Sequence, residues 1–196
     1  MSFESVRLFE EKIAEFYGAP YAVATDCCTH GIELCLRYNK TEKFTVPPKT
    51  YPSVPNLAAK IGIEFDWKEE EWKDYYFLGG TNIVDAAVLW EKDSYIPGSL
   101  MCLSFQFKKH LSLGRGGMIL TDNLEAKEVL KKMSYDGRLP DIPWRDQNIS
   151  MLGFHYYMTP ETAQDGLDKL QRAIDTPPRK WKLDEWPDLR EMDLYK

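Results

Sequence analysis

Apolar residues recur along the chain at the spacing of short helices and short buried strands. Between Ser2 and Tyr17 they fall every three or four residues, from Val6 to Phe16, and Gly18 follows as a helix stop. Similar patterns predict further helices at residues 32–38, 54–61, 125–133 and 160–174. Short apolar runs predict strands at residues 21–24, 44–46, 63–67, 83–89, 100–105 and 118–121.

Strands that alternate with helices are typical of a sheet that carries helices on both faces. Because a helical crossover usually places two strands in the same direction, we expect an α/β fold with a mostly parallel sheet. Thr159 and Pro160 open the last helix, and Pro177 ends it. Residues 1–178 are therefore the predicted domain. Residues 179–196 form a tail that wraps the surface, wraps a partner subunit or is mobile.

The composition fits one compact soluble protein and argues against some partners. Of 196 residues, 43% are hydrophobic, which is enough for one sizeable core. A net charge of −6 argues against nonspecific binding to nucleic acid or to anionic membranes. Four cysteines, with Cys27 and Cys28 adjacent, match neither a zinc site nor a disulfide framework, so we expect reduced thiols in the cytoplasm and no metal. Without a signal-peptide pattern or a long apolar segment, we expect no membrane anchor.

A lysine lies between the apolar runs at residues 100–105 and 117–120. Lys109 is followed by a glycine-rich turn that ends at Gly116 and Gly117. A lysine amine attacks a carbonyl only when it is deprotonated and held against it, so a lysine that carries an aldehyde cofactor needs a rigid, partly desolvated position. The two runs can supply that position, although the pattern alone also fits a surface lysine beside a hairpin.

Three upstream segments carry further candidate chemistry. Residues 21–31 predict a strand, a polar turn and a helix start, where Thr29 and the next amides hold a phosphate or where Asp26 and Thr29 simply cap the helix. Tyr51 follows a strand end beside prolines, and it either stacks on a flat ring or packs as an ordinary tyrosine. Asp85 ends an apolar run, where it is a strand-terminal cap or the partner of a protonated pyridine nitrogen.

In this order the chain resembles the DegT/StrS-type family of fold-type-I sugar aminotransferases, which depend on pyridoxal 5′-phosphate (PLP). Residues 9–24 are similar to the family's opening helix and first strand. From Ser104 the sequence matches the family pattern Ser-Phe-x-x-x-Lys-x-Leu-x-x-Gly-x-Gly-Gly, which favours Lys109 over Lys108. Residues 152–159 resemble the family's Gly-Tyr-Asn-Tyr-Arg-Met segment, which reaches into the partner subunit's active site.

The resemblance implies a role for each matching residue. Lys109 is the Schiff-base lysine, Tyr51 the ring-stacking aromatic, Asp85 the pyridinium partner, Ser104 and Thr29 phosphate ligands, and His155 the residue that enters the partner's site. The implied fold is the large domain of fold-type-I transferases, and the implied assembly is a homodimer. The implied reaction moves an amine from a donor such as glutamate to a nucleotide-linked keto-sugar, with no nucleic acid or membrane as partner.

Several positions depart from the family pattern. Of the family's Ser-Ser-Gly-Thr turn only Thr29 is kept, and His155 and Tyr157 replace an asparagine and an arginine. Val88 stands where a histidine or glutamine is usual. Family members are also longer and add a small C-terminal domain, while the spacing from Tyr51 to Asp85 is short, and the stretch between them lacks one β-α unit of the family sheet.

These departures leave two alternatives beside the aminotransferase. A PLP-fold protein that binds the cofactor or a partner without turnover would suit Val88 and His155. A sugar dehydratase is the other alternative, since it uses the same cofactor. Family dehydratases replace the lysine with histidine, however, and the glycine spacing keeps Lys109 rather than His110 in register.

Overall fold

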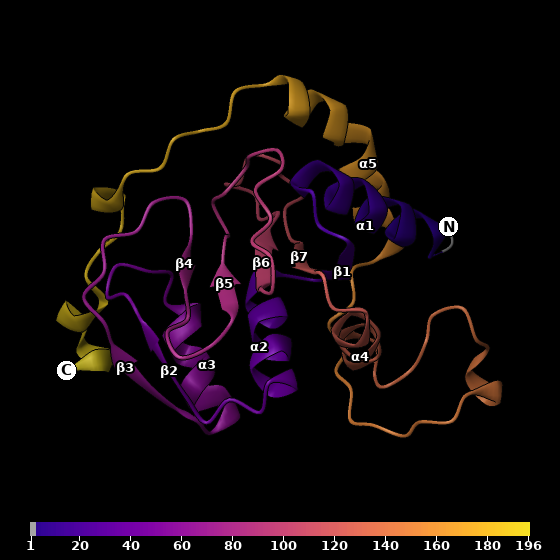
Figure 1. The fold of residues 1–196 in the computed structure, drawn as a ribbon, viewed down its shortest axis with the longest axis horizontal. Helices are drawn as coiled ribbons and strands as arrows, with labels where there is room; N and C mark the ends of the chain where they lie inside the picture. The colour runs from indigo at the N-terminus through magenta and orange to yellow at the C-terminus, as the bar shows by residue number, and fades with distance from the viewer. Residues whose placement is uncertain (1–2) are drawn as a thin grey trace.

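The computed structural model, which describes residues 3–196, centres on a five-stranded sheet in the order β1-β7-β6-β5-β4 (Figure 1). Its strands are β1 (Tyr21–Thr25), β4 (Tyr76–Phe77), β5 (Ile83–Asp85), β6 (Leu100–Ser104) and β7 (Gly117–Thr121). A second sheet pairs β2 (Lys43–Val46) with β3 (Glu64–Trp67) in parallel. Thr45 and Gly79 exchange two backbone hydrogen bonds, of 3.1 and 2.9 Å, and so bridge the two sheets.

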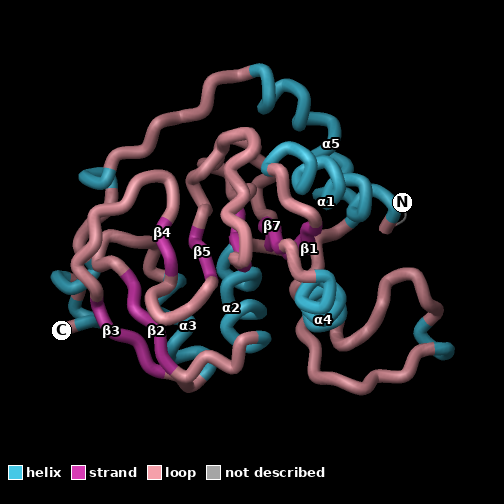
Figure 2. Tube along the Cα trace, viewed as in Figure 1, coloured by secondary structure: helices cyan, strands magenta, loops and turns pink. Residues whose placement is uncertain are grey.

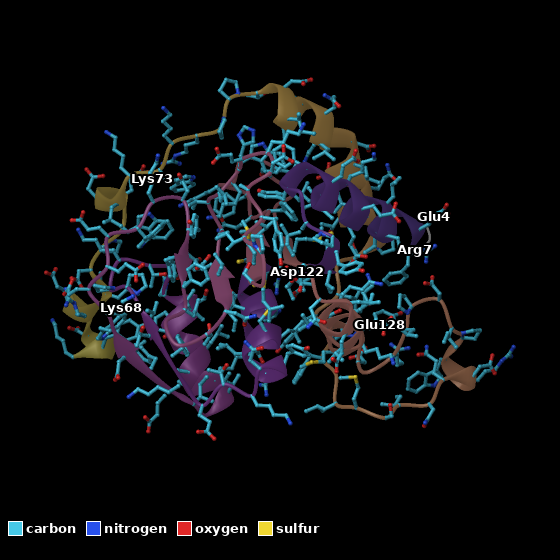
Figure 3. All side chains as sticks on the ribbon, in the orientation of Figure 1. Glu4, Arg7, Lys68, Lys73, Asp122 and Glu128 are labelled. Carbon is cyan, nitrogen blue, oxygen red and sulfur yellow. The ribbon has the colours of Figure 1, made fainter. Side chains whose placement is uncertain are left out.

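Helices cover both faces of the central sheet (Figure 2). The helices are α1 (Glu4–Tyr17), α2 (Cys28–Tyr38), α3 (Ser53–Ile61), α4 (Leu124–Ser134) and α5 (Pro160–Asp175). Side chains alternate along each strand: Met118 and Leu120 of β7 pack in the cluster that contains α1 and α5, and Ile119 packs with α2 and α4. Figure 3 draws the side chains of the described residues on the same ribbon. The predicted α/β class with two covered faces is confirmed.

The prediction of a mostly parallel sheet is wrong. In the central sheet β5 and β6 are parallel, whereas the β1–β7, β7–β6 and β4–β5 pairs are antiparallel. The physical reason lies in the connections, because residues 105–116 return the chain from β6 to β7 through a loop instead of a helix. A tight turn at residues 78–82 likewise joins β4 to β5. Apolar runs identify strands but do not report the direction of a neighbour.

Element ends follow local signals in most places. The first helix was predicted from Ser2, which lies outside the described residues, and α1 begins at Glu4. Gly18 ends it in the left-handed conformation, with a φ of 73°. The predicted strand at residues 83–89 is shorter, because the chain leaves the sheet after Asp85 and Trp90 stacks on Phe16 with 4.7 Å between ring centroids.

The C-terminal segment of residues 179–196 lies along the chain's own surface. In Figure 1 it runs from α5 across the molecule to the edge formed by β2 and β3. Leu189 is buried and its N–H donates to the Pro48 carbonyl at 3.0 Å, and the Tyr195 hydroxyl donates to Asn56 at 2.7 Å. The short helices η2 (Leu183–Glu185), η3 (Leu189–Glu191) and η4 (Asp193–Tyr195) belong to this segment, and η1 (Trp144–Asp146) precedes α5. Within residues 3–196, no helix has the length and apolar character needed to cross a membrane.

Candidate active site

A cavity of about 190 Å³ opens where the carboxyl ends of β5 and β6 meet the first turn of α2. The carboxyl ends of adjacent parallel strands are a common place for ligand binding in α/β sheets. Five of the six predicted site residues line this cavity: Thr29, Tyr51, Asp85, Ser104 and Lys109. They come from four segments that are far apart in the sequence, with Ser104 and Lys109 in the same one, so the fold gathers them into one place.

Asp85 is the buried carboxylate of the cavity. The Tyr76 hydroxyl donates to its Oδ2 at 2.7 Å, and the Ala87 N–H donates to its Oδ1 at 3.0 Å. Burial raises the pKa of Asp85 above its ordinary value, and these two hydrogen bonds and the charge of Lys109 act against that rise. Each carboxylate oxygen retains capacity for a second donor, so Asp85 can still accept from a cationic N–H.

Lys109 occupies a turn immediately after β6. Its N–H donates to the Gln106 carbonyl at 2.8 Å, and its Nζ lies 5.0 Å from the centroid of the Trp181 ring. Burial lowers the pKa of Lys109, and the charge of Asp85 acts against this. A lowered pKa favours the neutral, nucleophilic form of this amine.

The first turn of α2 is suited to an anion. No side chain among residues 3–196 caps this helix N-terminus, which leaves its first N–H groups for another acceptor. The Thr29 hydroxyl lies 2.7 Å from that of Ser53. Burial lowers the pKa of His30, but the hydrogen bonds and charges of Asp26 and Cys27 together outweigh burial and the pKa rises to about 9. At neutral pH His30 therefore adds positive charge beside the turn, and so does Arg115, which lines the cavity.

Gly117 lets β7 approach the turn closely. A Cβ at this position would meet the carbonyl carbon of Cys27 at 2.4 Å and the backbone nitrogen of Cys28 at 2.5 Å. Real Cβ atoms do not come so near to backbone, so a side chain at Gly117 would push the turn away from the sheet. The glycine-rich stretch after Lys109 therefore lets the first turn of α2 lie close against β7.

Asp26, Cys27 and His30 bring three potential metal ligands within 4.8 Å of one another. The two Asp26 oxygens already accept from His30 and from Arg115, each at 2.7 Å. A divalent cation would have to compete with both of these cationic partners, so we propose no metal here.

The remaining predicted residue, His155, lies apart from the cavity. Its side chain is 70% exposed, and its Nδ1 lies 2.9 Å from Asp136 Oδ2. Val88, by contrast, lies in the cavity wall. Its apolar side chain offers no hydrogen bond to a ligand.

Sequence reasoning missed Tyr76, whose hydroxyl connects Asp85 to the Thr50 hydroxyl at 2.5 Å. A usable signal existed, because Gly79 and Gly80 separate two apolar runs in the manner of a hairpin. The hairpin pairs Tyr76 directly with Asp85 across β4 and β5. Trp72 and Trp186, also in the cavity wall, had no comparable signal.

A model of the DegT/DnrJ/EryC1/StrS aminotransferase family matches residues 1–67 and 96–185. The unmatched residues 68–95 contain β4, β5 and Asp85, so the place of Asp85 in the site rests on geometry. The gap overlaps the stretch between Tyr51 and Asp85, in which the sequence predicts that one family β-α unit is missing. A search of the curated proteins found no match to this chain.

Solved structures share the fold at low sequence identity. AtS13 from Actinomadura melliaura is 19% identical with a TM-score of 0.73, and the match covers 89% of this chain and 61% of AtS13. 3-Amino-5-hydroxybenzoic acid synthase is 18% identical with a TM-score of 0.75, over 88% of this chain and 56% of the other. Helicobacter pylori PseC, an aminotransferase of pseudoaminic acid biosynthesis, is 15% identical with a TM-score of 0.71, over 88% and 58%. The match thus spans 56% to 61% of each of these three structures.

Proposed function

Because the chain belongs to the DegT/DnrJ/EryC1/StrS aminotransferase family, we propose that it binds PLP in the cavity and transfers an amino group to a keto-sugar carried on a nucleotide. The observation that carries the proposal is the convergence of Lys109, with its lowered pKa, and the buried Asp85 on one cavity. Among the similar structures, DesI was solved with its TDP-sugar product, which supports a nucleotide-linked substrate. We also propose a cytoplasmic location, since the four cysteines are free thiols.

The residues of the cavity fit PLP. Thr29, Ser104 and the uncapped N-terminus of α2 would hold its phosphate, with Arg115 adding positive charge. Asp85 would accept a hydrogen bond from the pyridine nitrogen. Tyr51 is half exposed at the cavity and would cover one face of the ring.

PLP, when bound, supplies an electron sink for the carbon that bears the donor's amino group. Lys109 Nζ has the properties of a nucleophile toward a carbonyl, because desolvation favours its neutral form. The same atom, once free, can accept a proton from the donor's α-carbon as general base. Trp72, Trp186 and Val54 give the cavity wall an apolar part, which would limit the access of water to this exchange.

The proposal predicts a spectroscopic result. Purified protein mixed with PLP is expected to develop the visible absorption band of lysine-bound cofactor, and excess glutamate is expected to remove that band. A nucleotide keto-sugar should then restore it, because the amine leaves on the sugar. Absence of any band at saturating PLP would contradict the proposal.

A second candidate is a protein that binds PLP without turnover. Two observations favour it: apolar Val88 lines the cavity, and the Trp181 ring lies over the Lys109 amine. Transamination requires the reacting carbon to be aligned, and a misplacement of about 1 Å can cost on the order of 100-fold in rate. In the same experiment, a band that forms with PLP but persists with glutamate would identify this function.

We further propose a homodimer in which His155 reaches the cavity of the partner. His155→Ala should then weaken PLP binding by roughly tenfold, the effect of one lost hydrogen bond to a charged group. Thermal unfolding should change little, because this side chain is exposed. Light scattering checks the dimer and a PLP titration checks the variant. A monomer that binds PLP tightly, with the variant equal to wild type, would rule the arrangement out.

A further inference from the structure

The hydroxyl groups of Thr50 and Tyr76 and the carboxylate of Asp85 form a chain of hydrogen bonds in the cavity wall. Tyr76 donates to Asp85 Oδ2 at 2.7 Å, so Thr50 donates the 2.5 Å hydrogen bond between the two hydroxyls. Thr50 is 1% exposed, Tyr76 3% and Asp85 6%, so water competes little for these bonds. The chain therefore directs the Tyr76 O–H toward the carboxylate.

Both oxygens of the Asp85 carboxylate are held, each by a different part of the chain. The Tyr76 hydroxyl of β4 holds Oδ2, and the Ala87 N–H, just after β5, holds Oδ1 at 3.0 Å. Tyr76 and Asp85 are directly paired residues of the antiparallel strands β4 and β5, so strand pairing sets the distance between them. The carboxylate cannot rotate without breaking one of these bonds, and its remaining lone pairs keep a fixed direction.

Tyr76 also influences the charge of Asp85. Burial raises the pKa of Asp85, and the Tyr76 hydrogen bond is the largest influence in the opposite direction, to which the charge of Lys109 adds. Cys28 on α2 and Cys102 on β6 lie near the carboxylate, but burial raises the pKa of both thiols, so they carry no charge at neutral pH. Tyr76 is thus the protein group that most favours the anionic form.

We propose that Tyr76 is a positioning residue that holds Asp85 as an oriented anion for a cationic N–H of an aromatic ligand, with Thr50 directing the Tyr76 hydroxyl. The inference rests on the proposed function and deepens it, because a protonated pyridine nitrogen is such a group. Tyr76 lies in residues 68–95, outside the family match, so the family pattern assigns it no role. Its effect on the ligand passes through Asp85.

The first test measures Asp85 in the absence of any ligand. Carbon-13 NMR of protein labelled at the aspartate carboxyl groups follows each titration, and Asp85→Asn identifies the Asp85 signal by its loss. In Tyr76→Phe the Asp85 midpoint should move to higher pH, because the anion loses a donor. Tyr75→Phe is the matched control, since Tyr75 is exposed and lies outside the cavity wall, and it should leave the midpoint unchanged. An unmoved or lowered midpoint in Tyr76→Phe would overturn the inference.

Thr50 offers a second pair of variants that leaves Tyr76 in place. Thr50→Val keeps the size of the side chain but removes the hydroxyl that directs the Tyr76 O–H. The Asp85 midpoint should then move in the same direction as in Tyr76→Phe, by a smaller amount. Thr50→Ser keeps a hydroxyl and should titrate as wild type does. Equal midpoints in the Val and Ser variants would contradict the part given to Thr50.

The second test is a double-mutant cycle on PLP affinity, measured by absorbance. Tyr76→Phe should weaken PLP binding on the order of tenfold, the effect of one lost hydrogen bond to a charged group. In the Asp85→Asn background the same substitution should have little effect, because the carboxylate through which it acts is gone. An equal loss in both backgrounds would overturn the inference. Failure of wild type to bind PLP would reject the proposed function instead, and the NMR titration would still decide on Tyr76.

Discussion

Lys109→Ala is expected to abolish the covalent attachment of PLP and to lower any transamination rate by on the order of 10²- to 10⁴-fold, the usual contribution of general acid–base catalysis. The reason is that Lys109 is the partly buried amine of the cavity, with its pKa lowered by desolvation. Borohydride reduction after incubation with PLP, followed by peptide mass mapping, measures the attachment site. Wild type should carry the pyridoxyl group on Lys109.

Lys108→Ala is the matched control, because Lys108 is exposed and its Nζ lies 5.6 Å from the Phe107 ring. This variant should label as wild type does. Labelling of Lys108 in wild type, or undiminished labelling of the Lys109→Ala protein, would refute the assignment. Labelling of wild type should also set in at a lower pH than labelling of an exposed lysine, since a lowered pKa leaves more of the Lys109 amine neutral.

Asp85→Asn is expected to weaken PLP binding on the order of 30-fold or more, because it removes the buried charge opposite the proposed pyridinium. The asparagine Oδ1 can still accept from the Ala87 N–H, and its Nδ2–H can donate to the Tyr76 hydroxyl, so the cavity should keep its shape. A PLP titration by absorbance measures the loss. Asp168→Asn, an exposed acid on α5, is the control and should bind PLP as wild type does. Unchanged affinity of the Asp85 variant would contradict the assigned role.

The same substitution should stabilise the ligand-free protein at neutral pH. Burial raises the pKa of Asp85, so the folded state holds this proton at pH values where the unfolded chain has lost it. Folding stability contributed by Asp85 is therefore present below the ordinary aspartate pKa and falls as the pH rises through the raised value. The advantage of Asp85→Asn should grow over that window and vanish in acid. Urea unfolding at several pH values measures it.

Much of the fold follows from short-range patterns. The apolar stripe of α1, the glycine at its end and the Thr159 cap of α5 each act within a few residues, so the sequence reports them directly. Strand direction does not follow in this way. The antiparallel direction of β7 depends on the loop that connects it to β6 and on the pairing of β7 with β1, which is distant in the sequence.

The residues of the candidate site also fall into two groups, those that a local motif predicts and those that depend on tertiary contacts. Lys109 and Ser104 lie in one continuous motif, and Thr29 lies in a recognisable turn, so a linear pattern identifies them. Tyr76 acquires its significance only by pairing with Asp85 across a hairpin. Trp186 lies in the wall of the cavity, but it belongs to a C-terminal segment whose apolar residues show no periodic spacing. Partners that are set by tertiary contacts leave little trace in local sequence.

The bridge between Thr45 and Gly79 joins the two sheets at one point of the backbone, and side-chain packing supplies the rest of the contact. The cavity lies across this seam, with Tyr51 and Ser53 on the side of the small sheet and Asp85 and Ser104 on the side of the large one. A molecule bound there contacts residues on both sides and so links the small sheet to the large one. Tighter binding of that molecule therefore also increases the free energy needed to separate the small sheet from the large one.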